Sequence, residues 1–235
     1  MTLGTQLYIS INTNLLDPRH TDDCGMLAWL EEQLDAASNA KKHPIVVGHI
    51  PPGVSSYDLS EQMNAELQAR LLSILAAYRS TVNSVLLGHV HRDEFRLLPT
   101  RTPLAMLVAT SVSPVYENNP GYRIYITEEN RHAGFNDYVQ FTFDLEQANR
   151  ASAPVWLPSY SFASEYDVDD ITPASLAAAK DAIFRNQVLS TLYARRLLGF
   201  YDKSAQQIRC TITSQTTQQL LDCTGVASQS ECIGL

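Results

Sequence analysis

Two short segments decide the fold of this chain: IVVGH at residues 45–49 and VLLGHVH at residues 85–91. Each segment is a short apolar run that ends at a glycine, and a histidine follows that glycine directly. Short apolar runs that stop at a glycine are typical of buried strands. In open α/β sheets, ligands collect at the carboxyl ends of the strands, so we expect both histidine groups at one functional edge.

The sequence around these segments alternates between strands and helices. The run LYISI over residues 7–11 predicts a buried strand, and leucines with helical spacing after it predict a helix capped by Asp22 or Asp23. A second amphipathic helix is predicted over about residues 59–78, between the two histidine segments. The order strand, helix, strand, helix, strand predicts parallel pairing through crossovers and places the chain in the α/β class.

The middle of the chain has a different character. Three strand-like runs follow one another without intervening helices, over residues 104–109, 122–126 and 138–145. Consecutive strands without crossover helices are typical of antiparallel pairing. We therefore expect an antiparallel or mixed continuation of the sheet.

The last third of the chain is predicted to be helical. An acid-rich link over residues 165–170 precedes Thr172 and Pro173, which form a good N-cap with proline at the first helical position. One long amphipathic helix is predicted to follow this cap, with Val188 on its apolar face. We therefore expect two domains, an α/β body over residues 1–164 and a helical subdomain over residues 165–235.

The composition excludes several classes of protein. Hydrophobic residues make up 45% of the 235 residues and charged residues 18%, so the chain can bury a sizeable core rather than remain disordered. The formal net charge of -8 argues against a general nucleic-acid binder or a binder of anionic membranes. No apolar run approaches the roughly 20 residues that a membrane-spanning helix needs.

The four cysteines are unevenly placed. Cys24 is alone, whereas Cys210, Cys223 and Cys232 lie within the last 26 residues. This cluster contains no Cys-x-x-Cys pair, which argues against a structural zinc site. Two interpretations remain: a disulfide near the C-terminus, which implies an oxidising compartment, or four reduced thiols.

Three histidines at consecutive strand ends predict a metal site. Each of His49 and His89 follows a glycine, which is expected to let the backbone turn, and His91 lies two residues farther on. A single histidine after a strand is usually a satisfied polar residue, but three in this arrangement favour metal ligation by neutral imidazole. Asp93 and Glu94 follow directly, and we expect them to orient a ligand by hydrogen bonds, the alternative being simple exposure.

The motifs resemble those of a known family. GHIPPG (48–53) and GHVHRDEF (88–95) resemble the two C-terminal motifs of the calcineurin-like metallophosphoesterases, and the likeness is closest to the acid sphingomyelinase-like phosphodiesterase branch. NPGYRIY (119–125) is similar to a further segment of that branch, and the spacing of Cys210 and Cys223 resembles its C-terminal helical subdomain. Other catalytic patterns do not occur: there is no Gly-x-Ser-x-Gly elbow, phosphate-binding glycine loop or dinucleotide fingerprint.

The resemblance implies a fold and a site. The fold would be the C-terminal half of a metallophosphoesterase-type β-sandwich flanked by helices, followed by a small helical subdomain with a Cys210–Cys223 disulfide. The family site holds two zinc ions bridged by an aspartate and a water or hydroxide, and these ions stabilise charge on the phosphoryl group. By motif position, His49 and His89 would bind the second zinc and His91 the first. From their shared position at consecutive strand ends, we predict that the three histidines cluster within metal-ligand reach of a common centre.

The resemblance also implies a substrate and a location. The substrate would be a phosphodiester, such as a phospholipid head group, cleaved in a secreted or lysosomal setting. From its place in the loop before the NPGYRIY segment, Tyr116 is expected to be a packed loop tyrosine, the alternative being a residue that lines the substrate pocket.

The sequence departs from the family in its N-terminal motifs. Asp-x-His, Gly-Asp-x-x-Asp and Gly-Asn-His-Asp/Glu do not occur here, so the bridging aspartate, the asparagine ligand and the histidine general acid have no counterpart. We therefore assign no catalytic residue and expect the chain to represent the C-terminal half of the family domain. Two hypotheses follow: a metal-dependent phosphodiester hydrolase represented by a fragment, or a non-catalytic binding module. In either case we expect self-association through exposed sheet surface.

Overall fold

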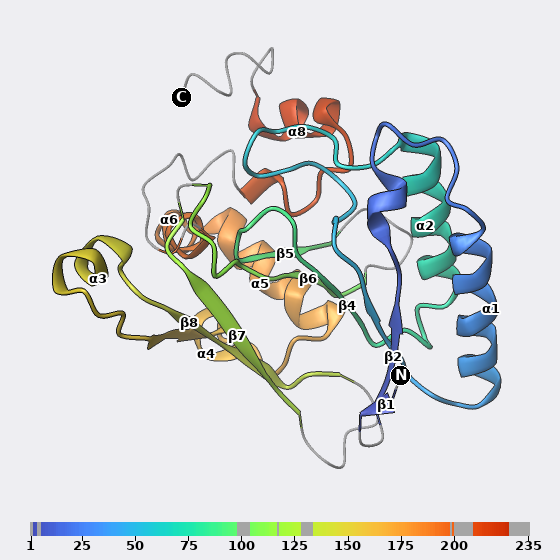
Figure 1. The fold of residues 1–235 in the computed structure, drawn as a ribbon, viewed down its shortest axis with the longest axis horizontal. Helices are drawn as coiled ribbons and strands as arrows, with labels where there is room; N and C mark the ends of the chain where they lie inside the picture. The colour runs from blue at the N-terminus through green and yellow to red at the C-terminus, as the bar shows by residue number, and fades with distance from the viewer. Residues whose placement is uncertain are drawn as a thin grey trace.

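The computed structural model describes residues 2–3, 6–97, 104–116, 118–127, 134–197, 199 and 209–225. These residues form a mixed α/β fold with two sheets and helices around them (Figure 1). The predicted α/β class is therefore confirmed. No helix within the described ranges is both long and apolar enough to span a bilayer.

The first sheet carries the two histidine segments. Its six strands lie in the order β1 (Thr2–Leu3), β2 (Gln6–Ser10), β3 (Ile45–Val47), β4 (Ser84–Leu87), β6 (Met106–Val108) and β5 (Glu94–Arg96). The four central strands pair in parallel, while β1 and β5 are antiparallel edge strands. The parallel crossovers predicted from the sequence are confirmed, because α1 (Met26–Asn39) joins β2 to β3 and α2 (Ala65–Ala77) joins β3 to β4.

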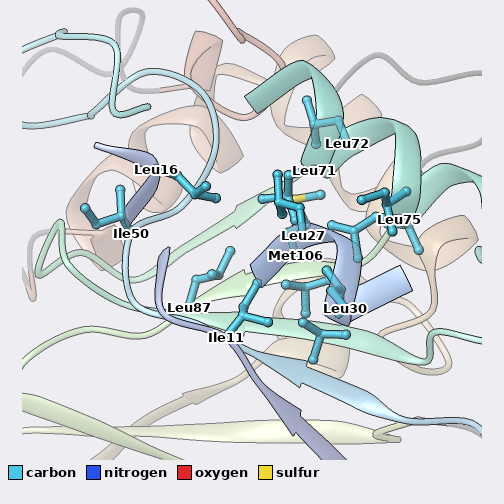
Figure 2. Close-up of a cluster of buried hydrophobic side chains, with 14 of the residues drawn as sticks. Ile11, Leu16, Leu27, Leu30, Ile50, Leu71, Leu72, Leu75, Leu87 and Met106 are labelled. Atoms are coloured by element: carbon cyan, nitrogen blue, oxygen red, sulfur yellow. The ribbon is translucent and has the colours of Figure 1, made fainter. Parts of the chain in front are cut away.

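One face of this sheet packs against α1 and α2. Leu27, Leu30 and Leu34 of α1 are fully buried, at 0% exposure each, as their helical spacing predicts. They pack with leucines of α2 and with strand residues in one apolar cluster, part of which Figure 2 shows around Leu71, Leu75 and Met106. Burying each such side chain stabilises the fold by roughly 1.5–3 kcal/mol before entropy is counted.

The opposite face of the sheet meets a second layer. The strands β7 (Gly121–Ile126), β8 (Asp137–Thr142) and β9 (Leu157–Ser161) form a separate antiparallel sheet in the order β7-β8-β9. The antiparallel pairing of the runs at 122–126 and 138–145 was predicted, but β9 was not, and the run at 104–109 is β6, which pairs in parallel with β4 in the first sheet. A second apolar cluster lies between the layers, with Phe95 and Leu107 from the first sheet and Tyr138 from β8. The short helix α3 (Leu145–Ala151) connects β8 to β9 and buries none of its residues.

The described residues after β9 are mainly helical. They form α4 (Phe162–Tyr166), α5 (Pro173–Arg185), α6 (Gln187–Leu197) and α8 (Thr217–Thr224). The predicted boundary at residue 165 falls inside α4, whose Phe162 and Tyr166 belong to the same apolar cluster as β8. The division into two domains stays a prediction.

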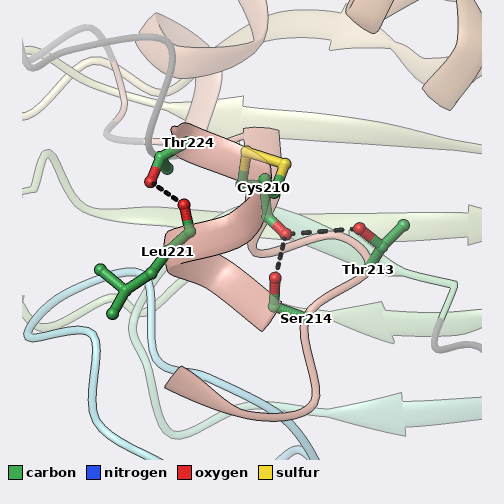
Figure 3. Close-up of a disulfide and its surroundings, with 6 residues drawn as sticks. Cys210, Thr213, Ser214, Leu221 and Thr224 are labelled. Carbon is green, nitrogen blue, oxygen red and sulfur yellow. Dashed lines mark hydrogen bonds between the residues drawn. A yellow bond between two sulfur atoms is a disulfide. The ribbon is translucent and has the colours of Figure 1, made fainter. Parts of the chain in front are cut away.

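A disulfide joins Cys210 to Cys223, with the Cα atoms 5.9 Å apart and a sequence separation of 13 (Figure 3). The pairing that the resemblance implied is thereby confirmed, and a loop of this size contributes about 3 kcal/mol by the chain-entropy estimate. Cys24 forms no disulfide with a described residue, and Cys232 lies outside the described ranges.

Several predicted boundaries were wrong for local reasons. The helix predicted from residue 59 begins at Ala65, because Leu59 has a φ of 61° and the Asn64 side chain caps the helix. The single helix predicted after Thr172 is two helices, because Asn186 is extended and its side chain accepts from the amide of Val188. As a result, Val188 is 73% exposed rather than buried.

Two smaller features also differ from the sequence prediction. The helix α1 begins at Met26 rather than at an aspartate cap, although the Asp23 carboxylate accepts a hydrogen bond from the Leu27 amide at 2.6 Å. The run predicted as a strand over residues 138–145 ends at Thr142, because Asp144 caps α3. The strand β5 was not predicted at all.

Candidate metal-binding site

The parallel pairing of β3 with β4 brings the two histidine segments together. Val47 pairs with Leu86, so both strands end at the same edge of the sheet. Two backbone hydrogen bonds continue the ladder beyond the strands: the amide of Gly48 donates to Leu86 O, and the amide of Gly88 donates to His49 O, each at 2.9 Å. The backbone of His49 is thus held directly beside the start of the second histidine segment.

The side chains of His49 and His89 are in contact. His89 Nδ1 lies 3.1 Å from His49 Nε2, and the ring centroids are 4.9 Å apart in an edge-on arrangement. Both residues are exposed to solvent. The two nitrogens lie within hydrogen-bond distance, and an ion that displaced the proton between them would face both.

His91 faces a different neighbour. Its ring lies edge-on to Tyr116, with the centroids 4.9 Å apart, and its Nδ1 atom is buried without a hydrogen-bond partner in the described structure. Within the described ranges, no three His, Cys, Asp or Glu side chains converge closely enough to hold one metal ion. The three histidines thus divide into a contacting pair and a separate third member, and do not form one three-ligand group.

The sharp turn after β4 is made by the histidines themselves. His89 has a φ of 71° and His91 a φ of 57°, which is the left-handed region that L residues rarely adopt. Gly88 does not have a positive φ, so the expectation that this glycine supplies the turn was wrong. A non-glycine residue held in this region costs about 1–3 kcal/mol, and such residues cluster at functional sites.

Gly48 serves a different purpose. It also lacks a positive φ, but a Cβ atom at this position would lie 2.8 Å from Thr13 Cγ2 and 3.1 Å from Leu87 Cδ2. The strand end therefore needs glycine for close packing and not for a turn.

The imidazoles of His89 and His91 are biased toward their neutral form. Partial burial, together with the nearby His49 and His91, lowers the pKa of His89 below its usual value. Burial, followed by His49 and Arg92, lowers the pKa of His91 in the same direction. Neutral imidazole is the form that can donate a lone pair to a metal.

Asp93 is buried in a polar cluster that belongs to the second sheet. Its carboxylate accepts from Arg123 Nη2 at 2.5 Å and from the Tyr160 hydroxyl at 2.7 Å, with the Tyr138 hydroxyl at 3.3 Å. Burial raises the pKa of Asp93, whereas Arg123 and the two hydroxyls oppose that shift. The same Arg123 nitrogen donates to Val108 O at 3.0 Å, so the cluster ties the histidine turn to β6 and β7.

Glu94 has different partners from Asp93. It forms an ion pair with Arg96 at 2.9 Å and accepts a short hydrogen bond from the Ser56 hydroxyl. Arg96 also donates to Pro52 O at 2.7 Å, within the loop that follows His49. Both acids are buried, which excludes the alternative of simple exposure. No hydrogen bond among the described residues joins either acid to a histidine ring, and their role in orienting a ligand stays a prediction. Each acid anchors the backbone that carries His91.

A hollow of about 180 Å³ lies beside His89. Its wall includes Tyr116 and also Tyr57, whose ring centroid is 4.8 Å from that of Tyr116. Tyr116 is thus packed against another loop tyrosine, and its role in a substrate pocket stays a prediction. No pattern in the sequence pointed to Tyr57. A larger hollow of about 530 Å³ lies between α3 and β9, but its lining contains no histidine, and its acid, Asp144, caps α3.

Comparison with known proteins decides the family. Residues 100–234, more than half of the chain, match the family described as the acid sphingomyelin phosphodiesterase C-terminal region. The chain belongs to this family. The sequence resemblance to the acid sphingomyelinase-like branch is thereby confirmed.

Individual relatives support the same assignment. The acid sphingomyelinase-like chain is 28% identical to "Sphingomyelinase phosphodiesterase D" of Dictyostelium discoideum over 97% of its own length and 54% of that protein. It is 29% identical to mouse "Cyclic GMP-AMP phosphodiesterase SMPDL3A", over 86% of itself and 45% of the relative. It is also 29% identical to human "Sphingomyelin phosphodiesterase", over 71% of its own length and 28% of that protein.

Two facts follow from these matches. The relatives are named as phosphodiesterases, so the parent family is one of enzymes. The chain spans about half the length, or less, of the curated relatives described here.

Proposed function

We propose that this chain supplies the histidine-bearing half of a metal-dependent phosphodiester hydrolase of the sphingomyelinase type. The family supports phosphodiester hydrolysis, and the structure adds a pair of convergent imidazoles at the carboxyl ends of adjacent parallel strands. We further propose that its two layers of sheet correspond to part of the metallophosphoesterase β-sandwich.

The spacing of the histidine pair is the observation that carries the proposal. Two nitrogen ligands at 2.0–2.1 Å from a tetrahedral zinc ion lie about 3.3 Å apart. His49 Nε2 and His89 Nδ1 are 3.1 Å apart, close to that separation. His91, with a buried and unpaired Nδ1, is offered as a ligand of a second ion. The donor set therefore fits zinc, with one ion held by two histidines and another by one.

The residues around the pair have distinct roles in this proposal. When bound, zinc would supply Lewis-acid stabilisation of charge on the phosphoryl oxygens. His49, His89 and His91 would hold the metals as neutral ligands. Tyr116 and Tyr57 line the hollow beside His89 and would contact the substrate, a phosphodiester such as a phospholipid head group. Asp93 and Glu94 would hold the turn that carries His91 in place.

A second candidate function is a non-catalytic binding module. It is favoured by the absence of any group of three metal-binding side chains among the described residues, and by the missing acidic motifs. Three histidines are neutral ligands, so nothing in this set offsets the charge of two divalent ions held about 3.5–4 Å apart. Activity measurements separate the two candidates.

The disulfide and the sheet surface support two further proposals. A disulfide between Cys210 and Cys223 suits an oxidising compartment, so we propose a secreted or lysosomal location. On β7, the side chains of Tyr122, Ile124 and Ile126 are all exposed although apolar. We propose that this face mediates self-association, which sedimentation of the purified chain would detect.

The activity test compares two polypeptides in the presence of zinc. The full product of the gene should hydrolyse a chromogenic phosphodiester, and a chelator or His89→Ala should abolish the turnover. The 235-residue chain by itself should show little or no turnover, because its motif set offers no bridging carboxylate. Turnover that survives both the chelator and His89→Ala would overturn the proposal. Metal binding without turnover by the full gene product would favour the binding module.

A further inference from the structure

Thr13 lies at the base of the loop that carries His49. It begins the short helix η1 (Thr13–Leu16) after β2, and its side chain is fully buried, at 0% exposure. Its hydroxyl oxygen accepts two hydrogen bonds from consecutive backbone amides, from His49 N at 2.8 Å and from Ile50 N at 2.6 Å. One side chain thus satisfies the amides of the second and third residues after β3.

The methyl group of Thr13 is as closely fitted as its hydroxyl. Thr13 Cγ2 occupies the space beside Gly48, where a Cβ atom would approach it to 2.8 Å. Real Cβ atoms do not tolerate a contact that short, so Gly48 and Thr13 fit only as a pair. The threonine therefore touches the strand end on one side and holds the histidine amide on the other.

The two ends of the His49 residue are held by different partners. Its amide donates to Thr13, and its carbonyl accepts from the amide of Gly88 at 2.9 Å. With both peptide groups fixed, few backbone conformations remain that direct the ring toward His89. Without Thr13, the buried amide of Ile50 would lose the acceptor that the structure gives it, and the loop would have to move to find another.

The loop beyond His49 is anchored independently of Thr13. Arg96 donates to Pro52 O at 2.7 Å, and the amide of Gly53 donates to the Gln68 side chain at 2.7 Å. Loss of the Thr13 hydroxyl should therefore leave the Pro52 end of the loop in place. The displacement should be confined to the segment around His49 and Ile50.

We infer that Thr13 is a positioning residue for His49, whose hydroxyl sets the backbone from which the His49 ring meets His89. The inference deepens the proposed function, because it rests on the use of that histidine pair as a metal site. No ligand role is assigned to Thr13 itself, since its oxygen is buried and occupied by two amides. Its contribution is to the geometry of the pair.

The test uses variants that separate the hydroxyl from the rest of the side chain. Thr13→Val keeps the shape but removes the acceptor, whereas Thr13→Ser keeps the acceptor and removes the methyl group. Thr13→Ala serves as a second hydroxyl-free variant if the valine variant does not fold. The urea midpoint of each variant is measured first, and all other data are collected on folded protein.

Two measurements are made on each variant. The first is the imidazole ¹⁵N spectrum of the metal-free chain, in which the His49–His89 contact appears in the ring nitrogen shifts. The second is zinc affinity by titration calorimetry, with His49→Ala as the reference for a lost ligand. Thr13→Val should change the ring shifts and weaken zinc binding about tenfold or more, as loss of an orienting partner does, and Thr13→Ser should restore both.

The outcomes distinguish the inference from the proposed function. A valine variant with a lower urea midpoint but unchanged ring shifts and unchanged zinc affinity would overturn the positioning role. If the parent chain shows no zinc binding that His49→Ala removes, the metal proposal fails. In that case the imidazole ¹⁵N shifts alone test the role of Thr13. The inference holds if Thr13→Val alters these shifts and Thr13→Ser does not. Any other result overturns it.

Discussion

Asp93 and Glu94 are neighbours in the sequence, but they join different parts of the molecule. Asp93 enters a cluster with Arg123 and Tyr160, which belongs to the second sheet. Glu94 pairs with Arg96, which reaches back to the loop after His49. Both acids are almost completely buried, at 3% and 1% exposure. Each is neutralised by its own arginine, so the turn that bears His91 is fixed from two sides.

The two clusters differ in the elements that they connect. The Asp93 cluster connects β5 to β6 and β7 and lies within the apolar layer between the sheets. The Glu94 cluster connects β5 to Pro52 and Ser56, both in the loop that follows His49. We therefore expect the first cluster to govern stability, and the second to govern both stability and the geometry of the histidine pair.

The largest effect is expected from Arg123→Met. This change leaves the Asp93 carboxylate buried without its cation and should lower the free energy of unfolding by about 3–5 kcal/mol. Urea denaturation provides the measurement. Adding Asp93→Asn should recover part of the loss, because the neutral amide needs no counter-charge. An Arg123→Met variant as stable as the parent would show that the Asp93–Arg123 pair is not buried as described.

Arg96→Met should destabilise the protein somewhat less, by about 3 kcal/mol, because Glu94 keeps its hydrogen bond from Ser56. It should also weaken zinc binding about tenfold, since Arg96 holds the Pro52 end of the His49 loop. Calorimetric titration of zinc into folded protein tests this, with Arg123→Met as the matched control. Equal losses of zinc affinity in both arginine variants would erase the distinction between the clusters.

Tyr160→Phe removes one hydroxyl from the Asp93 cluster without changing the ring packing. A hydrogen bond to a charged group contributes about 2 kcal/mol, so the unfolding free energy should fall by that amount. Tyr138→Phe is the natural comparison, because its hydroxyl is 3.3 Å from the carboxylate instead of 2.7 Å. The Tyr138 variant should lose less stability, and the reverse order would contradict the geometry of the cluster.

The smallest effect is expected from Ser56→Ala in the Glu94 cluster. Glu94 retains both contacts to Arg96, at 2.9 and 3.1 Å, so the loss should be about 1 kcal/mol. The urea midpoint measures it, and zinc affinity should not change by more than about twofold. A loss as large as that of Arg96→Met would mean that Ser56, rather than the ion pair, secures the loop.

The sequence predicted the features that depend on periodicity and strand ends. The strands before His49 and His89, the buried leucines of α1, and the meeting of the two histidines all follow from short-range patterns and one crossover. The Glu94–Arg96 pair becomes predictable only once residues 94–96 are known to form a strand. In a strand, residues two apart lie on the same face, and these two have opposite charges.

Other features depend on contacts that the sequence does not display. The Thr13 hydroxyl accepts a hydrogen bond from the amide of His49, 36 residues away in the sequence. Nothing in the sequence around Thr13 indicates that contact. The left-handed backbone falls on His89 and His91, residue types for which that conformation is not expected, and not on Gly88. Asn186 reads as an ordinary helical residue, but its side chain begins a new helix. The Thr13 contact depends on tertiary structure, whereas the Asn186 cap is a local contact between residues two apart.

Zinc titration of the metal-free chain, followed by calorimetry, tests the central claim most directly. The account predicts one zinc ion bound by the His49–His89 pair, with binding lost in both His49→Ala and His89→Ala. His91→Ala should retain that ion, since its ring faces Tyr116 and lies outside the contacting pair. An unchanged isotherm in His89→Ala, or no zinc binding by the parent chain, would contradict the assignment of this sheet edge as a metal site.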